Sequence, residues 1–349
     1  MSTGAPAGPP GDATPAPRAV VLLVNPAAGG GRARRVLDVV EDRLRRRGLP
    51  HRTHHTRSIA DVAVAVATAL DADETPVAVG GDGMIRLVAD AVSHRPGATI
   101  GIVPAGRGND LVRFLGLPRD PVAAADALVD GTPWAIDTGA VRGDDGGEQT
   151  FLSIASCGFD SEANRIANRA PKRLGGLTYV WGMLGALARL RNVRYALDLD
   201  DRAVVHHGLT VAIANAGTYG GGMRLAPDAS VSDGRLDVVL LRRHRGGPGP
   251  TSIVDRARLV RRLPDLFRGT HVRLADVDVE RAETVRVDAD ERFEVYADGD
   301  LVGRLPVTIA VRPRALRLLV PVGHRTPSGD GPHRLPRPEG VIGAGERAR

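Results

Sequence analysis

Residues 18–130 alternate between short apolar runs and segments in which apolar residues recur at helical spacing. Residues 18–25 (RAVVLLVN) contain an unbroken apolar run, which is typical of a strand buried on both faces. Residues 32–48 carry apolar side chains at helical spacing, from Val36 to Leu44, with charged residues between them. The other elements expected here are helices over 58–72, 84–93 and 109–116 and strands over 76–79 and 98–104. Repeated strand–loop–helix units predict a parallel sheet covered by helices on both faces.

Glycine-rich loops follow three strands of this expected sheet. They are residues 25–31 (NPAAGGG), 80–83 (GGDG) and 104–110 (PAGRGND). Glycine lets backbone N–H groups approach a ligand closely, and the N-terminus of a following helix attracts an anion. Because ligands bind at the carboxyl ends of parallel strands, the loops predict a phosphate-binding edge, with Asn109 as the helix cap of the third loop.

A carboxylate inside the second loop changes the expected ligand. Asp82 does not favour a bare phosphate, but carboxylate and water oxygens are the ligands that Mg²⁺ prefers. The chain has no GxxxxGK[ST] motif, and residues 25–34 lack the GxGxxG spacing of a dinucleotide fingerprint. The three loops together therefore predict a magnesium–nucleotide site, whereas a GGDG stretch taken alone is also consistent with a plain turn.

From about residue 137 the pattern changes to strands of alternating or apolar character joined by Gly/Asp turns. The strands expected are 208–216, 235–243, 283–289, 291–298 and 305–311. Only residues 160–191 look helical. The pattern predicts a second domain of antiparallel strands, a sandwich, reached across residues 127–141. Residues 51–57 (HRTHHTR) have no cysteine or carboxylate at metal-binding spacing and are expected to form an exposed loop.

Composition narrows the classes of function. The chain has 349 residues, 42% of them hydrophobic, which is enough for two cores. The net charge is +6, and nearly all the basic charge is arginine, Lys172 being the only lysine. This favours anionic surfaces such as phosphate or lipid headgroups, or else reflects a coding bias. Aromatic residues make up 3%, which is too few for the stacking platforms of single-strand nucleic-acid binding.

Cysteine content and the ends of the chain bear on location. Cys157 is the single cysteine, so an intrachain disulfide is excluded and a small buried residue is expected. Residues 1–17 lack the features of a signal peptide, and no apolar run is long enough to span a bilayer. Residues 1–17 and 322–349 have the composition of disordered tails. We therefore expect a cytoplasmic protein, with any membrane contact at its surface.

Five motifs, taken in order, carry a resemblance to a known family. They are VNPAAGGGRA, VGGDG, VPAGRGNDLVR, GGGMRLAPDASVSDGRLDVVLL and YADGD. Over residues 18–320 the chain resembles the diacylglycerol kinase catalytic-domain family, which includes bacterial lipid kinases and the sphingosine and ceramide kinases. The resemblance implies an N-terminal α/β domain similar to those of NAD kinases and phosphofructokinases, a C-terminal antiparallel β-sandwich, and ATP in the cleft between them. The implied boundaries are 18–138 for the nucleotide-binding domain, 139–305 for the lipid-substrate sandwich and 306–321 for a segment returning to the first domain.

The resemblance also assigns roles to residues. Asp300 matches the family's proposed proton acceptor, and Asp82 and Asp110 would help to organise the catalytic Mg²⁺. The positions where bacterial members hold a structural magnesium, partly through main-chain oxygens, are Ser230, Asp233 and Arg235. The residues expected to bind ATP are Asn25, Pro26, Thr56, Gly80, Gly81, Asp82, Gly83, Met84, Arg107, Gly108, Asn109 and Asp110.

Three departures from the family's pattern concern this site. The family usually reads GGDGT with Asn-Glu shortly after, where this chain has Met84, Arg86 and Leu87. It usually reads GTGND or GTAND, where Arg107 takes the threonine's place and can add a charge-assisted contact to phosphate. The glutamate of its DGE motif is Asp300 here, which is one methylene shorter but can still accept a proton.

These features predict an ATP-dependent lipid kinase with Mg²⁺ as cofactor, which phosphorylates the hydroxyl of diacylglycerol or a related lipid. The expected partner is a lipid substrate at an anionic bilayer surface, contacted through residues 170–191 and 261–269. Nucleic acid is not expected as a partner, and a homodimer is left open. Two alternatives remain: a kinase of a soluble substrate, as in NAD kinases, and a nucleotide- or lipid-binding member without catalytic activity.

Overall fold

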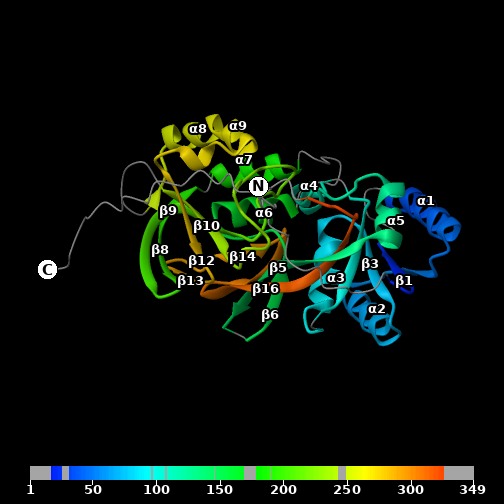
Figure 1. Cartoon of the computed structure of the whole chain (residues 1–349). Helices are drawn as coiled ribbons and strands as arrows, with labels where there is room; N and C mark the ends of the chain where they lie inside the picture. The colour runs from blue at the N-terminus through cyan, green and yellow to red at the C-terminus, as the bar shows by residue number, and fades with distance from the viewer. Residues whose placement is uncertain are drawn as a thin grey trace, which may run out of the picture.

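The computed structural model describes residues 17–25, 31–95, 97–106, 108–144, 146–168, 178–188, 190–242 and 249–325. The tails predicted over 1–17 and 322–349 lie almost entirely outside these residues. The described chain forms two units that share one long strand (Figure 1). We call them the α/β unit, from β1 to α5, and the sandwich unit, from β5 to β16. Within the described residues, no helix combines the length and apolar character needed to cross a membrane.

Parallel strands form the centre of the α/β unit, in the order β4-β3-β1-β2. The strands are β1 (Val20–Val24), β2 (His51–His55), β3 (Thr75–Gly80) and β4 (Thr99–Pro104). The helices are α1 (Arg32–Arg47), α2 (Ile59–Asp71), α3 (Asp82–Val92), α4 (Asp110–Leu115) and α5 (Pro121–Asp130). Helices α1 and α5 pack on one face of the sheet, and α2 and α3 pack on the other (Figure 1).

The side chains of β1 explain why its sequence is an unbroken apolar run. Val21 and Leu23 belong to the core under α2 and α3, whereas Val20, Leu22 and Val24 belong to the core under α1 and α5. Successive residues of a strand point to opposite faces, so a sheet covered on both sides needs apolar residues at every position. The parallel, doubly covered sheet predicted from the sequence is confirmed.

Residues 51–57 differ from the expected exposed loop, because His51–His55 form strand β2 at the edge of the parallel sheet. The strand pairs with β1 from Val20 to Val24 through its backbone. Its side chains are exposed or partly exposed, so no apolar pattern marks it in the sequence. Backbone pairing places this segment in the sheet, and polar contacts of Arg52 with Glu74 and of His54 with Asp61 add to it.

Antiparallel strands make up the sandwich unit, and the predicted fold class is confirmed there too. The strands are β5 (Thr132–Gly143), β6 (Glu148–Phe151), β7 (Ile154–Gly158), β8 (Arg191–Leu199), β9 (Arg202–Ala214), β10 (Leu236–Arg242), β11 (Gly249–Pro250), β12 (Val277–Ala282), β13 (Thr284–Ala289), β14 (Glu294–Ala297), β15 (Asp300–Arg304) and β16 (Val307–Val320). Their core includes the fully buried rings of Phe151 and Tyr195. Cys157 is buried in this core, and burial raises the pKa of its thiol to about 12, so it is a packing residue as expected.

Helices on the sandwich unit are more numerous than the sequence predicted. They are α6 (Phe159–Asn168), α7 (Thr178–Ala188), α8 (Ile253–Arg261), α9 (Leu263–Arg268) and the 3-10 helix η3 (His271–Arg273). The sequence indicated helix only over 160–191 and missed α8 and α9. Neither of these two has a fully buried residue, and only Leu263 and Leu266 of the short α9 pack against the core, so no long apolar stripe signals a helix here. A capping box of Ser252 and Asp255 starts α8.

Strand β16 belongs to both units. It pairs with β5 from Val307 to Val320, and at Arg317 and Leu318 it also pairs in parallel with β4 of the α/β unit. The strand order therefore runs without a break from β15 through β16 and β4 to β2. A continuous ladder of backbone hydrogen bonds fixes the position of one unit relative to the other.

Gly139 of β5 provides a test of the sandwich core. A Cβ at this position would lie 2.1 Å from the ring of Phe151, which is fully buried. We expect Gly139→Ala to lower the free energy of unfolding by about 1–3 kcal/mol, because the ring cannot move without disturbing the core. Urea unfolding followed by circular dichroism measures this loss. Gly303→Ala is the matched control, since its nearest contact is 3.8 Å away. Equal midpoints for the two variants would contradict the packing described.

Candidate active site

Two glycine loops touch at the carboxyl edge of the parallel sheet. The carbonyl of Gly80, at the end of β3, accepts the N–H groups of Ala105 and Gly106 at 2.8 and 3.1 Å. A Cβ on Gly106 would lie only 2.4 Å from the Cα of Gly81, so a side chain does not fit there. The GGDG and PAGRGND loops are thus in backbone contact, and glycine is required at the point of closest approach.

The start of α4 corrects the predicted helix cap. Asn109 occupies the cap position with φ 53°, but its side chain makes no capping bond. It bonds instead to the N–H and the carbonyl of Gly106, at 3.1 and 3.2 Å. The carboxylate of Asp82 caps α4 in its place, accepting the N–H groups of Asp110 and Leu111 at 3.0 and 3.1 Å. Asp82 therefore joins the second loop to the third.

Asp110 connects this site to the sandwich unit. Its carboxylate accepts a hydrogen bond from Arg113 at 2.6 Å and from the N–H of Gly221 at 2.6 Å. Its carbonyl accepts the hydroxyl of Thr218 at 3.1 Å. Gly221 has φ 88° within the glycine-rich turn that follows β9, a conformation that favours glycine. The GGGM motif of the sandwich unit thus bonds the carboxylate of Asp110, which belongs to the third glycine loop of the α/β unit.

The electrostatics of Asp82 follow from its position. Burial raises the pKa of its carboxyl, and the neighbouring Asp110 adds to this, although the N–H bonds it accepts act in the opposite direction. Both carboxylates lie close to Gly108, since a Cβ built there would be 3.6 Å from Asp82 and 3.8 Å from Asp110. Arg113 already bonds one oxygen of Asp110 at 2.6 Å, so we expect the two carboxylates to contact a Mg²⁺ ion mainly through its water, the ion itself being held by nucleotide phosphates. Within the described residues, no group of three or more His, Cys, Asp or Glu is placed to hold a metal by itself.

The other residues predicted to bind nucleotide lie in different surroundings. Thr56 donates from its backbone and its hydroxyl to the carbonyl of Val24, at 2.9 and 3.2 Å, so it lies beside Asn25 at the same sheet edge. Gly83 is exposed, with open space where a Cβ would be. Met84 is buried in the core under α2 and α3, and the base of its side chain lies against Gly80, since a Cβ on that glycine would be 2.7 Å from the Met84 Cβ. Pro26 and Arg107 lie outside the described residues.

Asp300 faces the α/β unit through an ion pair. Both its hydrogen bonds come from Arg86 of α3, whose Nη2 and Nε lie 2.8 and 3.2 Å from Oδ2. The Arg86 side chain is 6% exposed and that of Asp300 is 53% exposed. Asp298, two residues earlier, accepts the N–H groups of residues 152–154, and burial raises its pKa to about 6. The sequence marked Arg86 only as a departure and did not predict this contact.

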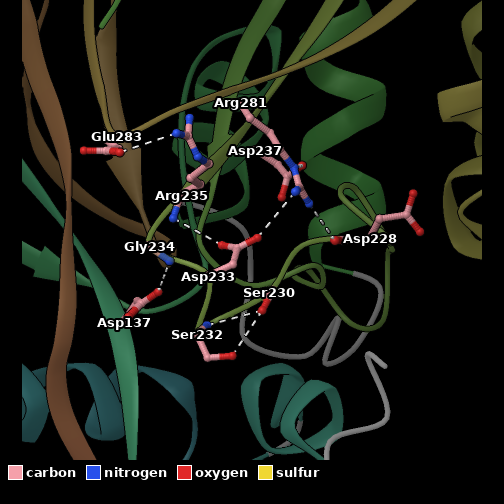
Figure 2. A network of polar contacts seen from close by, with 10 residues as sticks. All are labelled: Asp137, Asp228, Ser230, Ser232, Asp233, Gly234, Arg235, Asp237, Arg281 and Glu283. Carbon is pink, nitrogen blue, oxygen red and sulfur yellow. Dashed lines mark hydrogen bonds and ion pairs between the residues drawn. The ribbon is translucent and has the colours of Figure 1, made fainter. Parts of the chain in front are cut away.

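The predicted structural-magnesium residues lie in a network that contains an arginine (Figure 2). The guanidinium of Arg281 is 3.2 Å from Asp237 and 3.5 Å from Asp233, and it donates to the carbonyl of Asp228 at 3.3 Å. The cation between these carboxylates is thus supplied by the chain itself. A guanidinium that bonds these carboxylates competes with a magnesium ion for their oxygens, so we do not expect these side chains to hold the ion. The part of the predicted site that rests on main-chain oxygens stays a prediction.

The remaining members of this network are held by other contacts (Figure 2). Ser230 lies 3.3 Å from the hydroxyl of Ser232, and the guanidinium of Arg235 reaches Glu283 at 3.5 Å. Asp137 of β5 accepts the N–H of Gly234 at 2.7 Å. Arg281 could not be predicted from the sequence, because it lies on β12, far along the chain from most of the other members.

The comparisons with known proteins agree with this geometry. Residues 19–141 match the diacylglycerol kinase catalytic domain, and residues 153–320 match the YegS C-terminal NAD kinase beta sandwich-like domain. The chain is 38% identical over 312 residues to a diacylglycerol kinase of Mycobacterium tuberculosis, covering 86% of this chain and 95% of that one. It is 34% identical over 269 residues to the "Probable lipid kinase YegS-like" protein of Pseudomonas aeruginosa, covering 76% and 82%.

A solved structure shows the same fold. A diacylglycerol kinase from Bacillus anthracis superposes with a TM-score of 0.66 at 19% identity, covering 88% of this chain and 98% of the other. Glycine loops on a parallel sheet, closed by a sandwich with a facing carboxylate, define a kinase. The chain belongs to the diacylglycerol kinase catalytic-domain family.

The position of Arg281 predicts how the sandwich unit responds to magnesium. We expect the melting temperature of the nucleotide-free protein to be the same in EDTA and in Mg²⁺, because Arg281 already bonds the carboxylates of Asp233 and Asp237. Arg281→Met should lower the free energy of unfolding by about 3 kcal/mol, since Asp237 is only 3% exposed and would lose its bond to the guanidinium. Arg304→Met, which breaks an exposed pair with Glu294, is the control and should be nearly neutral. A clear rise of the wild-type melting temperature with Mg²⁺ would rule out this role for Arg281.

Proposed function

We propose that this protein transfers the γ-phosphoryl group of ATP to the hydroxyl of diacylglycerol or a related lipid, giving a phosphatidic-acid-type product. The observation that carries the proposal is the position of Asp300. Its carboxylate belongs to the sandwich unit, yet it is paired with a residue of α3, the helix that begins in the GGDG loop. A proton acceptor is thus bonded to Arg86, whose position on α3 is one helix turn beyond the GGDG loop.

The chain's own residues divide the work of phosphoryl transfer. The N–H groups of Ala105, Gly106 and Asp110 already donate within the protein. The phosphates would therefore be held by the other N–H groups of the loops at 80–83 and 104–110, aided by the N-terminal end of α3. The acceptor hydroxyl oxygen attacks the γ-phosphorus, and the bond from that phosphorus to the bridging oxygen of ADP breaks. The hydroxyl proton passes to Asp300. Asp82 and Asp110 would contact Mg²⁺ or its water, and when bound this ion neutralises charge on the triphosphate.

The lipid substrate requires contact with a membrane surface, and the helices of the sandwich unit offer one. We define the helical surface as the exposed side chains of Trp181 and Leu184 on α7, Ile253 and Val254 on α8, and Phe267 on α9. Helices α7, α8 and α9 lie together on one side of the sandwich unit (Figure 1). The basic residues of α8 and α9 are Arg256, Arg258, Arg261, Arg262 and Arg268. Exposed apolar side chains among arginines suit a bilayer with anionic headgroups.

Each of the two segments predicted to contact lipid has some side chains packed inward and others exposed. In α7, Met183 and Ala186 pack inward against α6, whereas Leu184 points outward. In α9, Leu266 packs against the same cluster and Phe267 is exposed. Residues 170–177 lie outside the described residues. The most exposed apolar residue of the helical surface is Ile253, which the sequence did not single out.

Asp300→Asn tests the catalytic part of the proposal. Radiolabelled ATP and diacylglycerol in mixed micelles should give labelled lipid with the wild type, and the variant should be slower by roughly 100-fold or more. Calorimetry should show unchanged affinity for magnesium–ATP, because the loops are untouched. Asp290→Asn serves as the control, since Asp290 is an exposed carboxylate paired with Arg194. Equal rates for wild type and Asp300→Asn would remove Asp300 from the role of base.

Liposome sedimentation tests the membrane surface. We expect the wild type to sediment with vesicles containing an anionic lipid, less so at high salt, and not with purely zwitterionic vesicles. Ile253→Ser/Val254→Ser should weaken this binding by removing exposed apolar contacts. Ile59→Ser/Val64→Ser is the matched control, because these residues are similarly exposed but lie on α2 of the other unit. Binding that both double variants retain equally would exclude α8 as the contact.

A further inference from the structure

One face of α3 carries three polar residues at intervals of four: Asp82, Arg86 and Asp90. Residues at this spacing lie one above another on the same side of a helix. The first caps α4, the second pairs with Asp300, and the carboxylate of the third accepts the N–H of Thr150 on β6 at 2.8 Å. This face of α3 therefore links the phosphate loop to the sandwich unit at two successive turns.

Arg86 is the fixed member of its ion pair. Its residue is buried, and a guanidinium in such a place must be paired, because an uncompensated buried charge is strongly destabilising. Asp298 lies near enough for the charge of Arg86 to oppose the rise that burial causes in its pKa. The arginine is thus attracted to two carboxylates of the same turn between β14 and β15, and this attraction holds it against the sandwich unit.

Asp300 is the more mobile member by its surroundings. It is half exposed and follows a turn in which Asp298 and Gly299 have φ 49° and 89°. Among the described residues, both hydrogen bonds to its carboxylate come from Arg86 and go to Oδ2. Both donors of the guanidinium converge on this one oxygen, so they hold Oδ2 in place more firmly than one bond to an ammonium could. Oδ1 is then the oxygen left for a proton.

We propose that Arg86 is a positioning residue for the acceptor side of the reaction: it holds Asp300 Oδ2 so that Oδ1 receives the proton of the attacking hydroxyl. The inference rests on the proposed function and adds a residue to it. Arg86 and Asp300 are also two of the positions at which this chain departs from the family's pattern, and they touch each other. Asp300 is shorter than the family's glutamate, and the arginine that also departs from the pattern is the residue that holds it.

Steady-state kinetics of Arg86 variants test the proposal. Arg86→Gln should lower kcat by roughly tenfold to 100-fold, the cost of a misplaced catalytic group, while the Kd for magnesium–ATP stays within about twofold. Arg86→Lys keeps a positive charge but not the fork, and we expect it to recover only part of the lost kcat. If Arg86→Gln does not fold, Arg86→Lys alone carries the comparison. A variant that changed KM for ATP and left kcat intact would indicate binding rather than positioning.

A double-mutant cycle separates positioning from stability. Arg86→Asn and Asp300→Glu should each lower kcat, and the double variant, which restores the family's residues at both positions, should recover most of it. Asp90→Ala breaks the other contact of the same helix face and is the control. Its effect on kcat should simply add to that of Asp300→Glu, whatever it does to the melting temperature.

The outcomes distinguish this inference from the proposed function. Wild-type protein that binds magnesium–ATP but phosphorylates no lipid would overturn the function and the positioning role with it. Wild-type turnover together with a kcat for Arg86→Gln equal to that of the wild type would overturn the positioning role alone. Additive effects of Arg86→Asn and Asp300→Glu would do the same.

Discussion

The hydrogen bonds from α4 to Asp82 are the constraint around which the site is built. The carboxylate belongs to α3 and the N–H groups to α4, so these bonds fix the distance between the GGDG and PAGRGND loops. The backbone contact of Gly81 with Gly106 depends on that separation. A partly buried carboxylate lowers the stability of the fold unless its hydrogen bonds are made. The structure of the carboxyl edge of the parallel sheet therefore depends on the side chain of Asp82. Arg86 lies on the next turn of α3 and bonds Asp300, so the position of α3 also sets the position of the expected proton acceptor.

The fold was predictable wherever burial leaves a pattern in the sequence. The parallel strands are covered on both faces, which requires apolar runs, and α1 has a buried stripe at helical spacing. Strand β2 and helices α8 and α9 have no such stripe, because backbone pairing or capping places them while most of their side chains remain in solvent. A pattern of side chains cannot report an element that buries none.

The site was predictable in its local parts and not in its long-range contacts. The glycine loops are visible because steric limits on the backbone act within a few residues. The pair of Arg86 and Asp300 joins positions 214 residues apart, and Arg281 reaches Asp237 from another strand. The sequence showed arginine-rich composition, which suggested an anionic surface or a coding bias. Part of that charge is internal, where the planar guanidinium suits carboxylates that are partly withdrawn from water.

Strand β16 has a consequence for how the chain acquires its structure. The α/β sheet is encoded in the first third of the sequence, but one flank of β4 is completed by Arg317 and Leu318, close to the end of the described chain. During synthesis, the hydrogen-bonding edge of β4 stays open until residues 317 and 318 have left the ribosome. Such an edge is a template for pairing with other chains, so the interval before β16 arrives is when this protein is most exposed to misassembly.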